Sequence, residues 1–309
     1  MSIFFNYIKD YFRADFKLAP HLIIGLFLAV TITLNYYFQI YENLNSLYYK
    51  TTTGVIILWG FYLFAFFSAV AIISFFKTEK KPLFNKNFLL FGVIGLFFLS
   101  VDSSYYILNF AQPLMPRDPF VSDWVNACVS NLSSFFTVII PLYIIYFCVK
   151  HFKPELYGFR LNGARISSYF WLILCMIPLI YLASLRPDFL ETYPTYNDNF
   201  EYKFLHTEQW LTAGIYELCY GFDFISVELF FRGFLVVALS RFVGKDAILV
   251  MVVVYAFLHF GKPAGETISS IFGGYILGIL AYSSRNIYGG LVAHLGVAWG
   301  MEYFAYLQS

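Results

Sequence analysis

The chain has 309 residues, of which 60% are apolar, 22% are aromatic and 13% are charged. A soluble domain carries about a quarter charged residues and about half apolar ones, so the composition excludes a soluble globule. The formal net charge of +1 gives no indication of a nucleic-acid partner. The sequence therefore predicts an all-α fold, a polytopic membrane bundle of helices.

Residues 1–20 begin with the aromatic, amphipathic stretch MSIFFNYIKDYFRADF. This stretch has neither the short apolar core nor the small-residue cleavage site of a signal peptide. It predicts an amphipathic helix that lies in the membrane interface.

Long apolar runs fill the rest of the chain, and a helix needs about 20 mainly apolar residues to cross the hydrocarbon core. The runs predict eight or nine transmembrane helices, because one is short and another is long enough to project beyond the membrane. We expect residues 21–205 to hold the N-terminal transmembrane helices and residues 206–309 to form a C-terminal helical core. The runs lie near 21–39, 53–76, 88–110, 129–149, 168–185, 209–241, 247–260, 267–284 and 287–307.

The loops between these runs indicate an orientation, because basic residues mark cytoplasmic loops. The loop 186–208 is, by contrast, acidic and rich in Tyr and Phe. We expect an integral protein of the cytoplasmic (inner) membrane of a bacterium, with its N-terminus inside and with membrane lipids as immediate partners. The basic residues of the loops expected inside are Lys77, Lys80, Lys81, Lys86, Lys150, Lys153, Arg160, Arg165, Arg241, Lys245 and Arg285.

Ionisable side chains at membrane depth are costly, at least about 2.5 kcal/mol each on insertion scales, so each needs a reason. Asp102 is the one clear case in the first two thirds of the chain. The others gather in the last third, at Glu217, Asp223, Glu228, Arg232, His259, Glu266, His294 and Glu302.

Glu228 and Arg232 are four residues apart in SVELFFRGF, so they share a helical face and can form an ion pair. Such a pair is often purely structural, since each charge makes the other tolerable in an apolar surrounding. His259 and His294 lie in two other predicted spans, where a lone histidine is often a hydrogen-bonded core residue.

Depth favours a functional reading of these residues. At about 1.5 Å rise per residue, Glu228 and His259 lie about 20 Å from the cytoplasmic ends of their spans, and His294 about 13 Å. Three costly groups from three helices thus fall near one level, as a buried reaction site requires: a carboxylate to take a proton, and imidazoles to shuttle it or to stabilise an oxyanion. Glu228, His259 and His294 are equally a donor set for zinc.

Other features of the last third favour packing or capping. Ser270, Gly274 and Gly278 recur every four residues and predict a close helix–helix contact. Glu266 opens the same predicted helix, where a carboxylate suits the positive end of the dipole, yet it is near enough to His259 in sequence to join the site. The sequence leaves open whether Glu217, Asp223 and Glu302 line a polar cavity or pair with Tyr hydroxyls.

This constellation resembles the CPBP family, which groups CAAX-processing endopeptidases with bacteriocin-processing and bacterial Abi proteins. The family signature is Glu-Glu-x3-Arg, then Phe-x3-His, then His-x3-Asn or Asp, on successive helices. The matching stretches are Val227-Glu228-x3-Arg232, Tyr255-x3-His259 and His294-x3-Ala298, and the resemblance covers about residues 205–305.

The resemblance implies a glutamate-dependent intramembrane endopeptidase, of a type often catalogued as a metalloprotease. It implies that Glu228 and His259 position or activate water, that His294 donates to the oxyanion and that Arg232 orients Glu228. It makes a peptide or membrane-associated protein the expected substrate; nothing identifies a partner chain.

Two departures from the signature matter. Val227 replaces the first glutamate, the usual general base, and Ala298 replaces the Asn or Asp that supplies an oxyanion donor. Tyr255 in place of Phe is a milder aromatic exchange. Either Glu228 or Glu266 has become the base, or the chain is a catalytically silent relative that acts as a membrane binding or scaffold protein. A transporter is disfavoured because no matched repeats or broken helices are visible.

Overall fold

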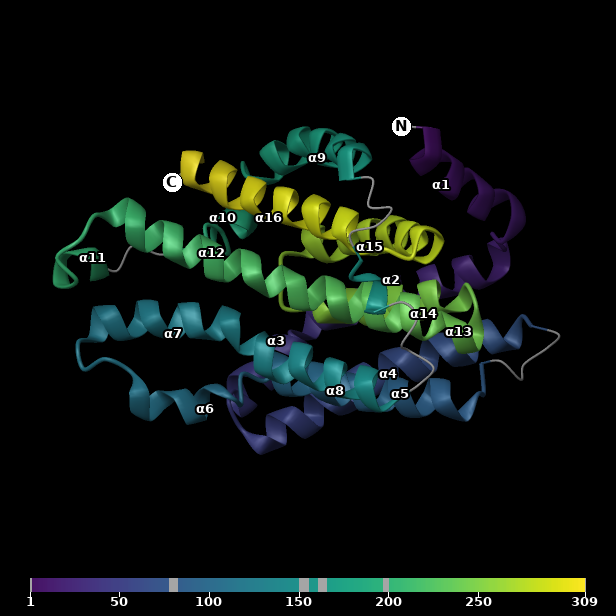
Figure 1. Cartoon of the computed structure of the whole chain (residues 1–309), viewed down its shortest axis with the longest axis horizontal. Helices are drawn as coiled ribbons and strands as arrows, with labels where there is room; N and C mark the ends of the chain where they lie inside the picture. The colour runs from purple at the N-terminus through teal and green to yellow at the C-terminus, as the bar shows by residue number, and fades with distance from the viewer. Residues whose placement is uncertain (1, 78–82, 150–155, 161–165, 197–199, 309) are drawn as a thin grey trace.

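A computed structural model describes the chain apart from residues 1, 78–82, 150–155, 161–165, 197–199 and 309. Lys80, Lys81, Lys150, Lys153 and Arg165 lie outside the described residues. Within them all regular structure is helical, which confirms the all-α membrane bundle (Figure 1).

The N-terminal two thirds of the chain form an amphipathic helix and a series of mainly apolar helices. The amphipathic helix, α1, turns the buried rings of Phe4 and Tyr11 toward the bundle and leaves Phe5 and Phe12 exposed. The helices are α1 (Ser2–Ala14), α2 (Leu18–Phe38), α3 (Ile40–Tyr48), α4 (Thr52–Phe75), α5 (Lys86–Ser103), α6 (Leu108–Ala111), α7 (Pro119–Ser134), α8 (Ile140–Cys148), α9 (Phe170–Ala183), α10 (Pro187–Leu190) and α11 (Glu201–Phe204).

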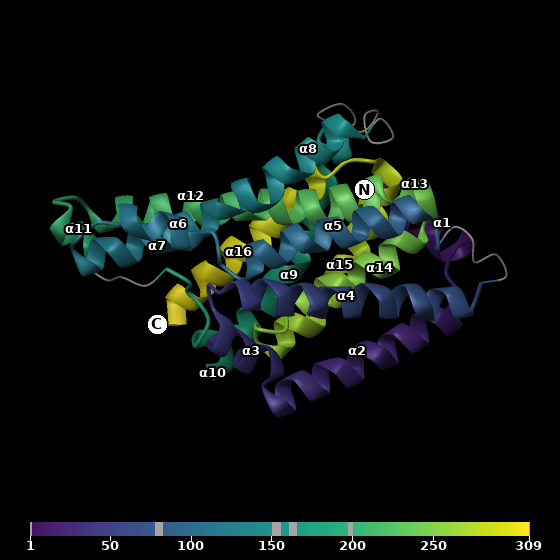
Figure 2. The ribbon, with the colours of Figure 1, turned by 90° about the horizontal axis from the view of Figure 1, so that it is seen from below.

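The last third forms the helices that carry most of the intramembrane charges. They are α12 (Gln209–Glu228), its continuation η6 (Leu229–Ala238), α13 (Ser240–Val243), α14 (Asp246–Leu258), α15 (Ala264–Ser284) and α16 (Tyr288–Gln308). In both ribbon views, α11 and α13 lie at opposite ends of the long axis, with α12 and η6 running between them (Figures 1 and 2).

Six helical stretches of the described chain are long and apolar enough to cross a membrane: Leu18–Phe38, Thr52–Phe75, Lys86–Ser103, Pro119–Cys148, Ile166–Ala183 and Ala264–Ser284. The other three predicted runs are helical as well, as α12 with η6, α14 and α16. Of these, α14 is apolar but only 13 residues long, and α12 carries Glu217, Asp223 and Glu228. Length and hydropathy therefore single out six spans among the expected eight or nine.

Two predicted boundaries differ from the observed ones. The run near 88–110 is interrupted because α5 ends at Ser103 and Tyr105 adopts a left-handed backbone with a φ of 54°. The run near 129–149 belongs to a helical stretch that begins at Pro119, where Asp118 caps the N-terminus by accepting from the Val121 N–H.

Two segments of the long helices have π-helical hydrogen bonding. The first, η2 (Phe135–Ile139), lies just before Pro141, which has no N–H and whose ring crowds the carbonyl four residues earlier. The second, η6, is ten residues long and fully buried, and it begins directly after Glu228. Such segments occur frequently at functional sites.

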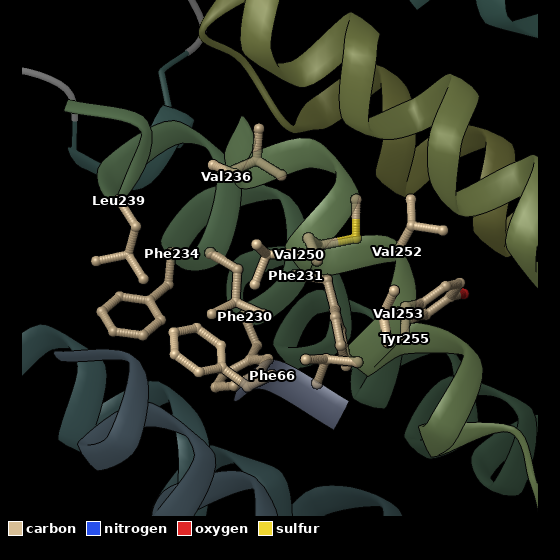
Figure 3. Close-up of a cluster of buried hydrophobic side chains, with 14 of the residues drawn as sticks. Phe66, Phe230, Phe231, Phe234, Val236, Leu239, Val250, Val252, Val253 and Tyr255 are labelled. Carbon is tan, nitrogen blue, oxygen red and sulfur yellow. The ribbon is translucent and has the colours of Figure 1, made fainter. Parts of the chain in front are cut away.

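The main core lies where η6 and α14 meet α4 and α5. Phe66 of α4 packs among Phe230 and Phe234 of η6, while Val250 and Val253 of α14 close the other side (Figure 3). Since α14 is buried along nearly its whole length, it is a central helix although it is short.

The turn between α14 and α15 breaks the helical path inside the bundle, because Pro263 cannot continue a helix. Its carbonyls are satisfied by neighbours, as an apolar surrounding requires. Asn35 of α2 donates to the Phe260 carbonyl at 2.9 Å, and the Tyr36 hydroxyl donates to the Lys262 carbonyl at 2.5 Å. Helix α2 thus holds this turn in place from the edge of the bundle (Figure 2).

The predicted small-residue face of α15 is confirmed as a packing face. A Cβ added at Gly274 would lie 2.8 Å from the Tyr255 ring, and one at Gly278 would lie 2.7 Å from the end of Met251, both on α14. The neighbouring Gly273 faces open space. Close approach of α14 and α15 therefore depends on the glycines of one face.

We expect Gly274→Ala to destabilise the protein by about 1–3 kcal/mol, because the added methyl group overpacks the contact with Tyr255. Gly273→Ala should be neutral or stabilising by up to about 1 kcal/mol, because alanine favours a helix and meets no neighbour. Denaturant unfolding in detergent micelles measures both; equal effects of the two variants would contradict the packing role.

Candidate functional site

Glu228 and Arg232 form the predicted ion pair at the junction of α12 and η6. The Glu228 Oε1 lies 3.1 Å from the Arg232 Nη1, and both side chains are almost completely inaccessible, at 0% and 1% exposed. A carboxylate at this depth is tolerable because the guanidinium compensates its charge.

His294 of α16 completes a connection to the same carboxylate oxygen. Its Nδ1 lies 3.1 Å from the Glu228 Oε1, and its ring packs on Phe224, one turn before Glu228, with 4.6 Å between ring centroids. The structure thus brings together Glu228, Arg232 and His294 from two segments that are far apart in the sequence.

Tyr255 of α14 lies between the other members of the site. Its hydroxyl is 3.3 Å from the His294 Nε2, and the Arg232 guanidinium lies over its ring at 4.3 Å from the centroid. His259 packs against the same ring, 4.5 Å between centroids, and its Nδ1 lies 2.9 Å from the Tyr255 carbonyl oxygen. His259 therefore adjoins the site through Tyr255; no hydrogen bond to Glu228 is found for it among the described residues.

The second carboxylate oxygen of Glu228, Oε2, is buried and has no hydrogen-bond partner among the described residues. It lies beside Gly290 of α16, where an added Cβ would be only 2.5 Å away. The lack of a side chain at Gly290 lets the carboxylate pack directly against the backbone of α16. Oε2 is thus a buried acceptor without a hydrogen-bond partner among the described residues.

Glu266 lies in the first turn of α15, as predicted, but its carboxylate accepts from the Tyr193 hydroxyl at 2.9 Å. Burial, with the Glu266 carboxylate beside it, raises the pKa of the Tyr193 hydroxyl well above its usual value, so Tyr193 remains a donor. Tyr193 belongs to the loop 186–208. Glu266 therefore anchors this loop, and no hydrogen bond or ion pair to Glu228 or His294 is found for it among the described residues.

The remaining intramembrane acids have their own surroundings. Glu302 accepts from the Thr195 N–H and hydroxyl at 2.8 and 2.7 Å, Asp223 accepts from the Ser226 hydroxyl at 3.1 Å, and Asp102 accepts from the Thr137 hydroxyl at 2.5 Å. Glu302, like Glu266, holds the loop 186–208. The Glu217 Oε2 is buried without a partner among the described residues.

The donor set for zinc does not fit the geometry. Across the described residues, no group of three His, Cys, Asp or Glu side chains is placed to hold a metal ion. Glu228 and His294 face one another at hydrogen-bond distance, while the Nδ1 of His259 faces the backbone. We derive no step that uses a metal.

Comparison with protein families gives the context of this geometry. Residues 209–300 match the model of the type II CAAX prenyl endopeptidase Rce1-like family. The match covers less than half of the chain and supports the CAAX-protease family for this segment. No curated protein and no solved structure matches the chain.

The CAAX-protease segment includes Glu228, Arg232, Tyr255, His259 and His294, all of the residues that the structure gathers. It also includes the two departures from the signature. Val227 is partly buried against the main core, and Ala298 is buried in α16, one turn after His294. Neither side chain can donate or accept a hydrogen bond.

Sequence reasoning overlooked two members of the site. The role of the Tyr255 hydroxyl is not evident from the sequence, because Tyr in place of Phe is a conservative aromatic exchange. Gly290 belongs to a Gly-Gly pair at the start of α16, and such a pair is typical of close helix packing, so its contact with Glu228 is not evident from the sequence. The positions one turn before His259 and His294 were the signal, because such residues lie on the same face.

We expect Arg232→Met to destabilise the protein by about 3–5 kcal/mol, because it leaves the Glu228 carboxylate buried without a compensating charge. The exposed pair of Arg186 and Asp188 is the control, and Arg186→Met should cost less than about 1 kcal/mol. Denaturant unfolding in micelles measures both. Adding Glu228→Gln to Arg232→Met should recover part of the loss; no recovery would show that Arg232 acts through its packing alone.

Proposed function

We propose that the chain is an intramembrane endopeptidase of the CAAX-protease type that hydrolyses a peptide bond with water activated by Glu228. The observation that carries the proposal is the contact of one buried carboxylate with Arg232 and His294 inside the segment that matches the family. The family that this segment matches makes a prenylated peptide with a C-terminal CAAX sequence the first substrate to test.

In the proposed reaction, the two carboxylate oxygens of Glu228 have separate tasks. Oε1 is held by Arg232 and His294, which fixes the orientation of the group. Oε2, beside Gly290, takes the proton of the attacking water. The water oxygen forms a bond to the carbonyl carbon, the C–N bond then breaks, and Glu228 returns the proton to the leaving amine. The base and the acid are one group.

The ring of Tyr255 supports this role because it holds Arg232, and through Arg232 the Glu228 carboxylate, in one position. Arg232 is fixed over the Tyr255 ring and cannot move away without losing that contact. His259 packs on the Tyr255 ring, so in this proposal it shapes the site instead of taking the water proton.

The second candidate function is a catalytically silent relative that binds a peptide or lipid. Val227 and Ala298 favour it, since they remove a base and an oxyanion donor from the signature, and one such donor is worth about 10²–10³ in rate in other enzymes. The two candidates make opposite predictions for Glu228.

We expect the purified protein in lipid vesicles to cleave a farnesylated CAAX peptide, and Glu228→Gln to lower the rate at least about 100-fold because the base is lost. Glu191→Gln, an exposed glutamate of the outer loop, is the matched control and should keep full activity. Mass spectrometry of the products identifies the cleaved bond, and an unprenylated peptide tests the need for the lipid. Equal rates for the unaltered chain and Glu228→Gln would favour the silent relative.

We further propose the orientation with the N-terminus inside, in the cytoplasmic membrane of a bacterium. Among the described residues, Lys77, Lys86, Arg241, Lys245 and Arg285 adjoin the helix ends on the α13 side, whereas the acidic loop with α11 lies at the other end (Figure 1). Basic residues favour the inner side.

In a chain whose four cysteines are replaced, we expect Glu208→Cys to react with a membrane-impermeant maleimide on intact cells, because it lies in the loop expected outside. Lys86→Cys, exposed at the start of α5, should react only after the membrane is opened. A mass shift on a gel measures the reaction of each cysteine, and the reverse pattern would overturn the orientation.

A further inference from the structure

His294 lies beside a buried ion pair. Glu228 carries one negative charge, and Arg232 already compensates it within the same buried group. A neutral imidazole has one ring nitrogen that donates and one that accepts.

The hydrogen bond to Glu228 decides which nitrogen donates. A carboxylate accepts only, so the His294 Nδ1, at 3.1 Å from the Glu228 Oε1, carries the proton. The Nε2 then has a lone pair and accepts from the Tyr255 hydroxyl. A neutral His294 in this tautomer cannot donate from Nε2 to an oxyanion, although the family resemblance implies that role.

The donor at this place is the hydroxyl of Tyr255. Its distance of 3.3 Å from the Nε2 is long for a hydrogen bond from a hydroxyl, so the proton is readily redirected to a stronger acceptor. The ring is fixed on several sides: Arg232 lies over it, Phe231 and His259 pack against it, and the bare backbone of Gly274 closes on it. A donor held in advance is what stabilises a developing charge most effectively.

We propose that Tyr255 is a catalytic residue that donates a hydrogen bond to the oxyanion of the tetrahedral intermediate, in place of the donor that Ala298 lacks. This inference rests on the proposed peptidase function. No proton is transferred from Tyr255: the hydroxyl turns from the His294 Nε2 to the carbonyl oxygen while negative charge is present, and turns back when the C–N bond breaks. His294 acts through its contacts with Glu228 and Tyr255, as a positioning residue.

Tyr255→Phe tests the proposal, since it removes the hydroxyl and keeps the ring that packs on Arg232, His259 and Gly274. With the farnesylated CAAX peptide, we expect kcat to fall about 100-fold with KM changed by less than about 3-fold, because the contact forms only in the transition state. A phosphonate analogue of the peptide, whose anionic oxygen resembles the oxyanion, should bind more weakly by a similar factor.

A second substitution separates the oxyanion donor from a structural role. Ala298→Asn supplies the family's donor, so it should raise the rate of Tyr255→Phe at least about 10-fold and change that of the unaltered chain much less. A fall in kcat that Ala298→Asn does not restore, with unchanged affinity for the phosphonate, would assign Tyr255 to structure alone.

The outcomes distinguish this inference from the proposed function. If Glu228→Gln is inactive and Tyr255→Phe keeps its rate within about 2-fold, the peptidase stands and the role of Tyr255 is overturned. If the unaltered chain does not cleave the peptide, both are overturned. Should Tyr255→Phe fail to fold, 3-fluorotyrosine at this position keeps the ring and makes the hydroxyl more acidic; an unchanged pH profile would then contradict the role.

Discussion

The compensation of one buried carboxylate governs the C-terminal third of this protein. Without Arg232, Glu228 would be an isolated charge in a membrane, and the segment could not insert at acceptable cost. The ion pair in turn explains the surroundings: Tyr255 lies under the guanidinium, Gly290 makes room for the carboxylate, and His294 shares its Oε1. Site and fold are therefore stabilised by the same contacts.

The charge balance of the pair also limits the chemistry. Because Arg232 and Glu228 cancel, each further group at the site is best accommodated as neutral, and its hydrogen-bond direction follows from that. A carboxylate, an imidazole and a phenol form a set in which the direction of each hydrogen bond follows from what each group can donate and accept. A site with few charges suits a membrane interior, because any additional charge there would need its own compensating partner.

Much of this arrangement could be predicted from the sequence. Apolar runs locate the helices, and the spacing of Glu228 and Arg232 predicts their contact because four residues are about one helical turn. The depth estimate places Glu228, His259 and His294 near one level, and Glu228 and His294 do meet although they are 66 residues apart. These features follow from the rise of a helix and the cost of buried charge, which are local and general.

Other features depend on the tertiary structure and could not be predicted. The left-handed backbone of Tyr105 after α5, the length of η6 and the contact of His259 with the Tyr255 ring arise from how helices pack. Glu266 was a candidate for the site because it is close to His259 in sequence, yet Tyr193, from a distant loop, is its partner. Sequence distance does not encode which side chain arrives from elsewhere.

The support that α2 gives to the turn between α14 and α15 bears on how the family-like segment evolves and can be engineered. A fragment beginning at residue 206 would retain every side chain of the site but lose Asn35 and Tyr36, leaving the Phe260 and Lys262 carbonyls facing lipid. Transplanting the C-terminal third onto another set of helices would therefore require an equivalent polar pair on the new neighbour. The side chains of the site lie in the C-terminal third of the chain, but backbone carbonyls of that segment accept hydrogen bonds from α2.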